Sequence, residues 1–291
     1  MVFRKFYLQD AKGARFDLNG ANGVYATDPS GLGIALSPAF ASLGAGFFKA
    51  TATKTEPQRS PGFTVNFTRR ATAYDQYREF TRFLSAAGDV LRLVYKPWGT
   101  AEYYRDVMLA ALEKTELTEV GWLVCPMEVK ALTPWYLPQT YRVELSAQAP
   151  TSMRYPFRYG SARYGAGRAP VFGAVLQPAG DIPAGLRLLF DGEAEDPAIT
   201  LVGLSTGKIY GRCDIAYTFV AGDQLQWATL PDDGYCRLLR AGDLVDLSGY
   251  LDMTGEPFFQ MPVTEPCILQ LTGSGLSGSG ELSVNYYYRT V

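Results

Sequence analysis

The spacing of apolar positions changes within residues 72–136, and the change predicts one helix followed by strands. Apolar side chains first recur three and four positions apart, with charged residues between them, at Tyr74, Tyr77, Phe80, Phe83 and Leu84. This spacing lines one face of a helix with apolar groups, so we expect a helix over Ala73–Ala87 that covers a sheet. The Thr72 hydroxyl suits the N-cap, and Gly88 suits a left-handed C-terminal cap.

Segments on both sides of this helix have the alternation or short apolar runs typical of strands. They are Phe3–Leu8, Ala14–Leu18, Phe63–Arg69, Val90–Lys96, Tyr103–Leu112, Trp122–Leu132 and Tyr141–Ala147. The turn at residues 10–13 predicts that the first two form a hairpin. We expect Val90–Lys96, Tyr103–Leu112 and Trp122–Leu132 to follow the helix as consecutive strands.

The second half of the chain shows only short strand patterns separated by turn residues. They are Leu186–Phe190, Ala198–Leu204, Lys208–Arg212, Ile215–Val220, Gln224–Ala228, Tyr235–Leu239, Cys267–Thr272 and Glu281–Arg289. Strands at this spacing favour an antiparallel sandwich or jelly roll. We expect a solvated turn at Asp191–Asp196 and a flexible hairpin loop at Gly273–Gly280.

A length of 291 residues favours two domains. We divide the chain into residues 1–150, a linker at 151–170 and a second domain at 171–291. The linker is rich in Arg, Tyr and Gly; it is either an extended connector or a segment that stacks on single-stranded nucleic acid. The net charge of -2 favours the connector. The fold class is mainly β, with two β-sandwich domains. The first carries one covering helix and a long β-hairpin, and the second is a galectin-like or jelly-roll sandwich.

The chain contains no histidine, which narrows its possible chemistry. Ser-His-Asp and Cys-His nucleophiles and His-ligated zinc are excluded. The four cysteines, Cys125, Cys213, Cys236 and Cys267, form no CxxC pair, and we interpret them as buried free thiols. The carboxylates of Asp191–Asp196 lack the EF-hand spacing. Gly273–Gly280 matches GxGxxG as a string, but a strand pattern rather than a helix follows it. We predict no enzyme, cofactor or metal.

Neither membranes nor nucleic acids are expected partners. No run of about eighteen apolar residues occurs, and the N-terminus lacks the apolar core of a signal peptide. The acidic balance gives no overall field for binding phosphates. We therefore expect a soluble protein made in a cytoplasm, with no membrane insertion and no specific nucleic-acid binding.

Four local features together resemble the distal tail proteins of phages and prophages with long non-contractile tails. These features are the N-terminal hairpin leading to Pro29–Gly33, the helix with Tyr77–Phe80, the strand run Leu91–Glu116, and the segment Leu132–Tyr136. They cover most of residues 1–150. The second half resembles the family only in architecture, as a sandwich similar to galectin-like and carbohydrate-binding modules.

The resemblance implies a non-catalytic structural protein of the virion tail. The first domain would form a ring, commonly a hexamer, at the far end of the tail tube, with its lumen open for DNA. The partners implied are other copies of the chain, the tail tube protein, the tape-measure protein and the tail-tip or receptor-binding proteins. A ring needs two different complementary surfaces on each subunit, and exposed strand edges can supply them.

Two sets of residues follow as candidate sites. For the ring contact we expect the strands after the helix to contribute, through Leu91, Leu93, Tyr95, Tyr103, Tyr104 and Val107; the alternative is that these strands pack under the helix. For a glycan-binding role of the second domain, the candidate stacking residues are Trp227, Tyr235 and Tyr250, which would otherwise be core. A cell-wall hydrolase is the least favoured class, because no feature selects a carboxylate pair.

Overall fold

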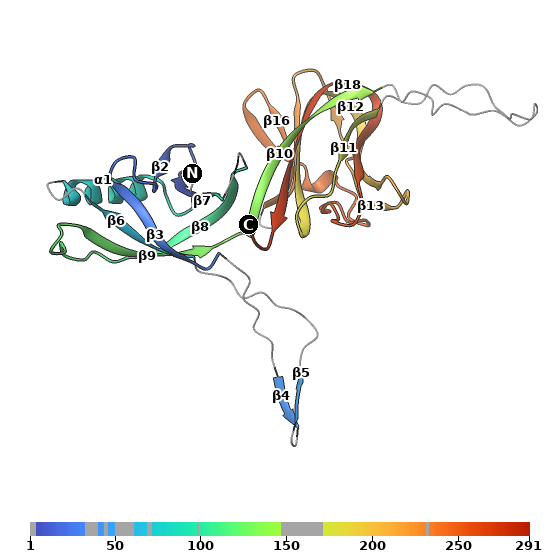
Figure 1. Cartoon of the computed structure of the whole chain (residues 1–291). Coiled ribbons are helices and arrows are strands. Elements are labelled where there is room, and N and C mark those ends of the chain that lie inside the picture. Colours follow the sequence, from blue (N-terminus) through green and yellow to red (C-terminus); the bar gives the residue numbers. More distant parts are fainter. Residues whose placement is uncertain are drawn as a thin grey trace, which may run out of the picture. The chain divides into compact units, whose positions relative to one another are not determined.

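The computed structural model describes residues 4–32, 40–43, 46–49, 61–68, 72–97, 99, 101–146, 171–230 and 233–291. The contacts divide the chain into unit 1, Met1–Leu137 with Tyr288–Val291, and unit 2, Pro138–Tyr287 (Figure 1). The boundary between the two units lies at Leu137. The sequence predicts it near residue 150. The proposed linker at 151–170 lies outside the described residues.

Unit 1 consists of strands and one α-helix. Its elements are β1 Lys5–Gln9, β2 Arg15–Asp17, β3 Val24–Ser30, β4 Phe40–Leu43, β5 Gly46–Lys49, β6 Gly62–Phe67, α1 Ala73–Ala86, β7 Leu91–Lys96, β8 Tyr103–Leu112, β9 Leu123–Ala131 and the start of β10 Trp135–Ser146. The mainly β prediction is confirmed, as are the helix and the hairpin formed by Leu91–Lys96 and Tyr103–Leu112, which are β7 and β8.

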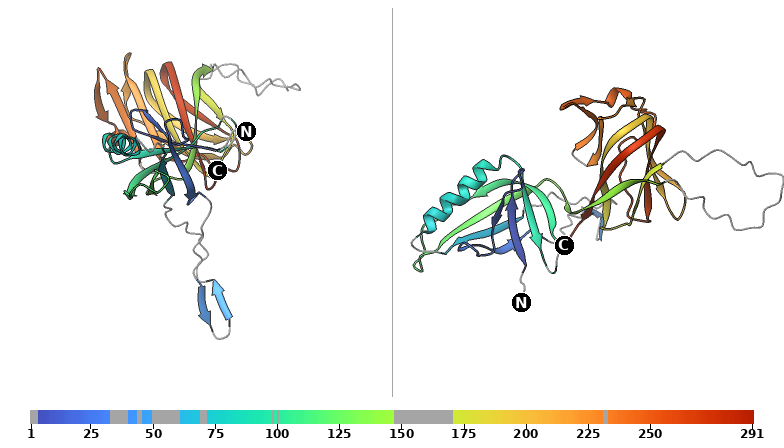
Figure 2. Two further views of the ribbon diagram at one scale, coloured as in Figure 1. Left: turned by 60° about the vertical axis from the view of Figure 1, so that its left-hand side comes forward. Right: turned by 90° about the horizontal axis from the view of Figure 1, so that it is seen from above.

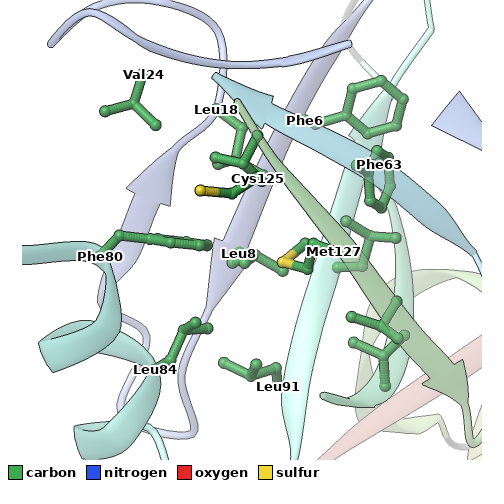
Figure 3. Packing of buried hydrophobic residues seen from close by; sticks show 14 of the residues in the cluster. Phe6, Leu8, Leu18, Val24, Phe63, Phe80, Leu84, Leu91, Cys125 and Met127 are labelled. Atoms are coloured by element: carbon green, nitrogen blue, oxygen red, sulfur yellow. The ribbon is translucent and has the colours of Figure 1, made fainter. Parts of the chain in front are cut away.

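The main sheet of unit 1 closes on itself. Its strands follow the order β1-β7-β8-β9-β6-β3, and the chain just after β2 joins the two ends. There the Leu18 amide donates to the Phe6 carbonyl at 3.2 Å, and the Ala26 amide donates to the Leu18 carbonyl at 2.9 Å. The inward side chains of all six strands therefore enclose one core. Figure 3 shows Leu8, Leu18, Phe63, Leu91 and Met127 meeting in this core.

Helix α1 covers this core with the face that its apolar spacing predicts. Phe80 is fully buried, and its ring lies 4.9 Å from that of Phe16 and 5.9 Å from that of Phe67. The right view of Figure 2 shows α1 running along one side of the unit 1 strands. Gly88 has φ +81°, which confirms the left-handed C-terminal cap. The Thr72 prediction is wrong, because the side chain of this N-cap residue makes no capping hydrogen bond.

Unit 2 is built on two long antiparallel strands. Its elements are the rest of β10, β11 Val171–Leu176, β12 Ile182–Gly203, β13 Ile209–Asp214, β14 Thr218–Phe219, β15 Gln224–Leu230, β16 Asp233–Arg240, β17 Asp243–Asp246, the 3-10 helix η1 Ser248–Tyr250 and β18 Cys267–Tyr288. Strands β12 and β18 each have 22 residues and pair along their whole length. The first half of β12 pairs also with β15, and its second half pairs with β14 and β13.

The expected turn at Asp191–Asp196 and the expected loop at Gly273–Gly280 are both wrong. Both segments are strand, and they pair with each other, with Gly192 opposite Gly278. At this point β12 changes its partner from β15 to β14, and the register shifts. Gly278 has φ +132°, and a Cβ there would overlap the Asp191 carbonyl oxygen. Glycine therefore lets the two backbones cross closely while they bend.

Candidate interaction surfaces

Four of the six residues predicted at the ring contact lie in the core of unit 1. Leu91, Leu93, Tyr95 and Val107 are at most 8% exposed. Strand β7 pairs with β1 on one edge and with β8 on the other. Because these side chains have almost no accessible surface, they cannot contact a neighbouring subunit, and the prediction is corrected for them.

Tyr104 lies at the surface in a cluster of aromatic and charged groups. Its ring stacks on that of Tyr136 at 5.9 Å between centroids. The guanidinium of Arg92 lies 5.8 Å from the Tyr104 ring centroid and 5.7 Å from that of Tyr136. Arg92 Nε and the Tyr136 hydroxyl both donate to Asp106 Oδ1, at 3.0 and 3.1 Å. The cluster holds these side chains in one arrangement, as a binding surface requires.

A second ion pair extends this cluster to β2. Arg15 donates to Glu102 Oε2 at 3.0 Å, and the Tyr104 hydroxyl donates to the same oxygen at 3.1 Å. Burial alone would raise the pKa of Glu102, but the hydrogen bond and charge of Arg15 outweigh it and lower this pKa below its usual value. The sixth predicted residue, Tyr103, is half-buried and packs edge-on against Tyr288. Ring contact by Tyr103 and Tyr104 stays a prediction.

The second half of β8 has a partner strand on only one side within the described residues. Strand β7 begins at Leu91, opposite Val107, so Met108–Leu112 pair only with β9. The Asp106 carbonyl accepts from Leu132 on the β9 side. Because neighbouring residues of a strand direct their backbone groups to opposite edges, Leu109 presents its N–H and C=O to the open side. We call Met108–Leu112 the open edge.

The open edge is apolar, besides having no second partner strand in the described part of the chain. Met108 and Leu109 are 41% and 39% exposed, and the two alanines after them are also exposed. Natural strand edges usually carry charges or proline, which block pairing with another chain. The open edge carries neither, so it is suited to accept a strand.

In unit 2 the three predicted stacking residues have different surroundings. Trp227 is fully buried, and its Nε1 donates to the Pro257 carbonyl at 3.1 Å. It is a core residue, so the prediction that it stacks on glycan is wrong. Tyr235 is half-buried, and the Arg237 guanidinium lies 4.4 Å from its ring centroid. Tyr250 is 47% exposed and packs edge-on against Tyr217. Glycan stacking by these two tyrosines stays a prediction.

Beside β15 and β16, unit 2 has an open hollow of about 390 Å³. Its lining comprises Thr229, Leu230, Gly234, Glu256, Phe258 and Gln260. Phe258 is half-buried, whereas Glu256 and Gln260 are exposed. An aromatic ring beside amide and carboxylate groups is a mixed lining that suits a polar organic ligand. Its lining comes from two separate segments, residues 229–234 and 256–260. The sequence alone does not predict that these segments meet.

The cysteines and carboxylates form no metal site in the described part of the chain, where no group of three or more potential ligands occurs. All four cysteines are free and buried, which confirms that prediction. Burial raises the pKa of Cys213 to about 12, which keeps it a thiol at neutral pH. No helix among the described residues has the length and apolar character needed to cross a membrane.

Comparison with known proteins identifies the domain in unit 1. Residues 5–132, nearly all of unit 1, match the model of the distal tail protein N-terminal domain. This part of the chain is a distal tail protein N-terminal domain. No curated protein matches the sequence. The resemblance carried by the hairpin, helix and strand run is thus confirmed.

Two solved structures that are similar in fold also come from phages. A chain of the phage P2 baseplate, in its activated conformation with Ca, has a TM-score of 0.65 at 16% identity, with 100% of both chains covered. The SPP1 Dit protein, described as a hub of the adsorption apparatus in phages that infect Gram-positive bacteria, has a TM-score of 0.59 at 12% identity, with 97% and 98% covered. These two chains thus share the fold of this chain over nearly its whole length.

Proposed function

We propose that this distal tail protein forms a closed ring, most simply a hexamer, at the far end of a phage tail tube. Unit 1 makes the ring and leaves the lumen open for DNA, and unit 2 faces outward. The ring joins the tail tube and the tape-measure protein to tail-tip or receptor-binding proteins. It has no catalytic role, and it resides in the virion tail.

The observation that carries this proposal is the family match, which falls on unit 1 almost from end to end. The fold likeness to baseplate and hub chains supports it over the whole length. The open edge supports it physically, because a closed ring needs adhesive surface on each subunit.

Immunolabelling of virions tests the location. Antibodies raised against unit 2 should label the distal end of the tail in electron micrographs. Label along the tail shaft, on the capsid or on no part of the virion would contradict the proposal. Tails assembled without this protein should lack their tip proteins, because the adaptor between the tail tube and the tip proteins is missing.

A second candidate function, glycan binding by unit 2, is favoured by the hollow beside Phe258 and by the exposed ring of Tyr250. Aromatic faces beside polar groups suit sugar rings. The test is a pull-down on bacterial cell wall with wild type, Phe258→Ala and Tyr250→Ala. Binding that falls at least several-fold in one variant supports this function. Absence of wild-type binding contradicts it and leaves the ring proposal intact.

A further inference from the structure

The hollow beside β15 and β16 in unit 2 owes half of its lining to one short segment. Burial alternates along residues 256–261: Glu256, Phe258 and Gln260 keep accessible surface, and the residues between them are buried. All three of these accessible residues line the hollow. One segment therefore presents a carboxylate, an aromatic ring and an amide to the same space.

The buried residues of this segment fix it to the core of unit 2. The Pro257 carbonyl accepts a hydrogen bond from Trp227 Nε1 at 3.1 Å. Phe259 is 3% exposed, and its ring centroid lies 5.0 Å from that of Trp227. The backbones of Met261 and Ala184 exchange two hydrogen bonds of 2.9 Å. Because the segment is anchored in this way, its three lining residues need little further ordering when a ligand binds.

A glycine of β16 gives the ring of Phe258 its place. A Cβ at Gly234 would lie 3.7 Å from the Phe258 ring, so the ring lies against the strand at this point. Phe258 stays half-buried and lines the hollow beside Thr229 and Leu230. A volume of about 390 Å³ falls in the range of small-molecule sites. The hollow can therefore hold one sugar ring against Phe258.

The charge of the lining selects the charge of the ligand. Glu256 contributes a carboxylate, and the six described residues of the lining include no Lys or Arg. The side chains of Glu256 and Gln260 form no hydrogen bond or ion pair with any other residue that the structure describes. A carboxylate, an amide oxygen and the face of an aromatic ring all attract a cation. An anionic ligand would instead be repelled by Glu256.

A second glutamate, in the same connection between β17 and β18, provides a contrast. Glu265 is buried, and its Oε1 accepts hydrogen bonds from the hydroxyls of Thr206, at 2.8 Å, and Tyr210. Its Oε2 accepts from the backbone amides of Ser205 and Thr206, both at 3.2 Å. The Glu265 carboxylate is thus used within unit 2, whereas that of Glu256 is available to a ligand.

We propose that this hollow binds a sugar ring that carries a free ammonium group, as in a hexosamine without an acetyl group. The sugar ring packs on Phe258, the ammonium group donates to the Glu256 carboxylate, and the Gln260 amide bonds a hydroxyl group of the sugar. This inference rests on the second candidate function, glycan binding by unit 2. It adds the class of sugar and the residue that selects it.

Ligand-observed NMR titration of the full-length chain with glucosamine and with glucose tests the proposal. The two sugars differ at one position, where glucose has a hydroxyl in place of the amine, and the amine is protonated at about pH 6. We expect glucosamine to bind about threefold more tightly, as one partly exposed ion pair allows. Glu256→Gln should abolish this preference and leave glucose binding unchanged, because it removes the charge and keeps the shape.

Two further variants show whether the effect belongs to this hollow. Glu281→Gln changes an exposed carboxylate outside the lining and should keep the preference for glucosamine. Phe258→Ala should weaken the binding of both sugars alike, because it removes the packing surface and not the charge. If Phe258→Ala bound both sugars as wild type does, the sugars would lie elsewhere and the inference would be overturned.

Two results overturn the inference and leave glycan binding by unit 2 standing: equal affinity of wild type for the two sugars, and a preference that survives in Glu256→Gln. If neither sugar binds, the inference fails, and the cell-wall pull-down judges the glycan function separately. Should Glu256→Gln not fold, wild type in about 1 M salt decides. The preference should then fall, because salt screens an exposed ion pair, and an unchanged preference contradicts the proposal.

Discussion

Unit 1 and unit 2 reach a β fold by different means, and their strand edges differ. Unit 1 closes one sheet around a core and covers it with α1, yet Met108–Leu112 is apolar and pairs on one side only, with β9, among the described residues. Unit 2 runs two 22-residue strands through a glycine crossing. Its edge strand β17 has an aspartate at each end. This difference supports the proposal that unit 1 carries the contacts between subunits.

The first prediction breaks the core of unit 1. Phe80→Ala removes a fully buried ring and should cost about 3–5 kcal/mol. Thermal unfolding followed through Trp135, a buried residue of unit 1, should shift down by roughly 10 °C or more. Arg82→Ala, on the exposed face of α1, is the control and should leave the transition in place. An unchanged transition in Phe80→Ala would contradict the packing of α1.

The second prediction breaks the strand crossing of unit 2. Gly278→Ala places a Cβ on the Asp191 carbonyl oxygen, and overpacking of this kind costs about 1–3 kcal/mol. The loss should appear in the fluorescence transition of Trp227, which lies in unit 2. Gly275→Ala is matched to it, because Gly275 also has positive φ but has no atom near the added Cβ. If Gly275→Ala were the more damaging change, the crossing would not depend on close approach.

The third prediction concerns an ion pair in unit 2. Arg240 donates to Asp223, whose side chain is buried, and this hydrogen bond lowers the pKa of Asp223 below its usual value. A carboxylate with a lowered pKa adds stability above its unfolded pKa of about 3.9, and this stability is lost as the pH falls through the folded pKa.

Asp223→Asn should therefore destabilise unit 2 by about 1–3 kcal/mol at pH 7. The drop in melting temperature between pH 7 and pH 3 should also become smaller in this variant than in wild type. Asp233→Asn, at an exposed position, serves as the control. If the melting temperature of Asp223→Asn fell as much between pH 7 and pH 3 as that of wild type, the ion pair would not contribute to the stability of unit 2.

The smallest effect is expected at the start of α1. A capping hydroxyl is typically worth about 1 kcal/mol, but Thr72 makes no capping bond. Thr72→Ala should therefore change the stability of unit 1 by less than about 0.5 kcal/mol, measured by urea denaturation. A loss of about 1 kcal/mol would contradict this expectation and would indicate that Thr72 caps the helix, as the sequence predicts.

Local patterns were enough to predict most of unit 1. The helix was predictable because Phe80 and Leu84 repeat at helical spacing, and Gly88 marks its end. The strand order, the closure of the sheet through Leu18 and the open edge were not predictable, because they depend on which strands pair. Leu109 is exposed because β7 begins only opposite Val107 and does not reach it. The sequence of β8 alone does not show where its neighbour begins.

Unit 2 shows where local patterns fail. Gly, Ser and Asp ordinarily mark turns, so the sequence around Gly192 and Gly278 predicts a turn and a loop. They are strand because they pair with each other, and pairing outweighs local preference. The failure at Trp227 has a similar cause, since an indole suits both a core and a sugar platform, and only the surrounding fold separates the two.

The most direct test of the account is the mass of the purified wild-type protein in solution, measured by light scattering and followed by negative-stain imaging. The account predicts a closed ring of about six times the 31.9 kDa chain mass, with a central opening. A monomer at every concentration would contradict it.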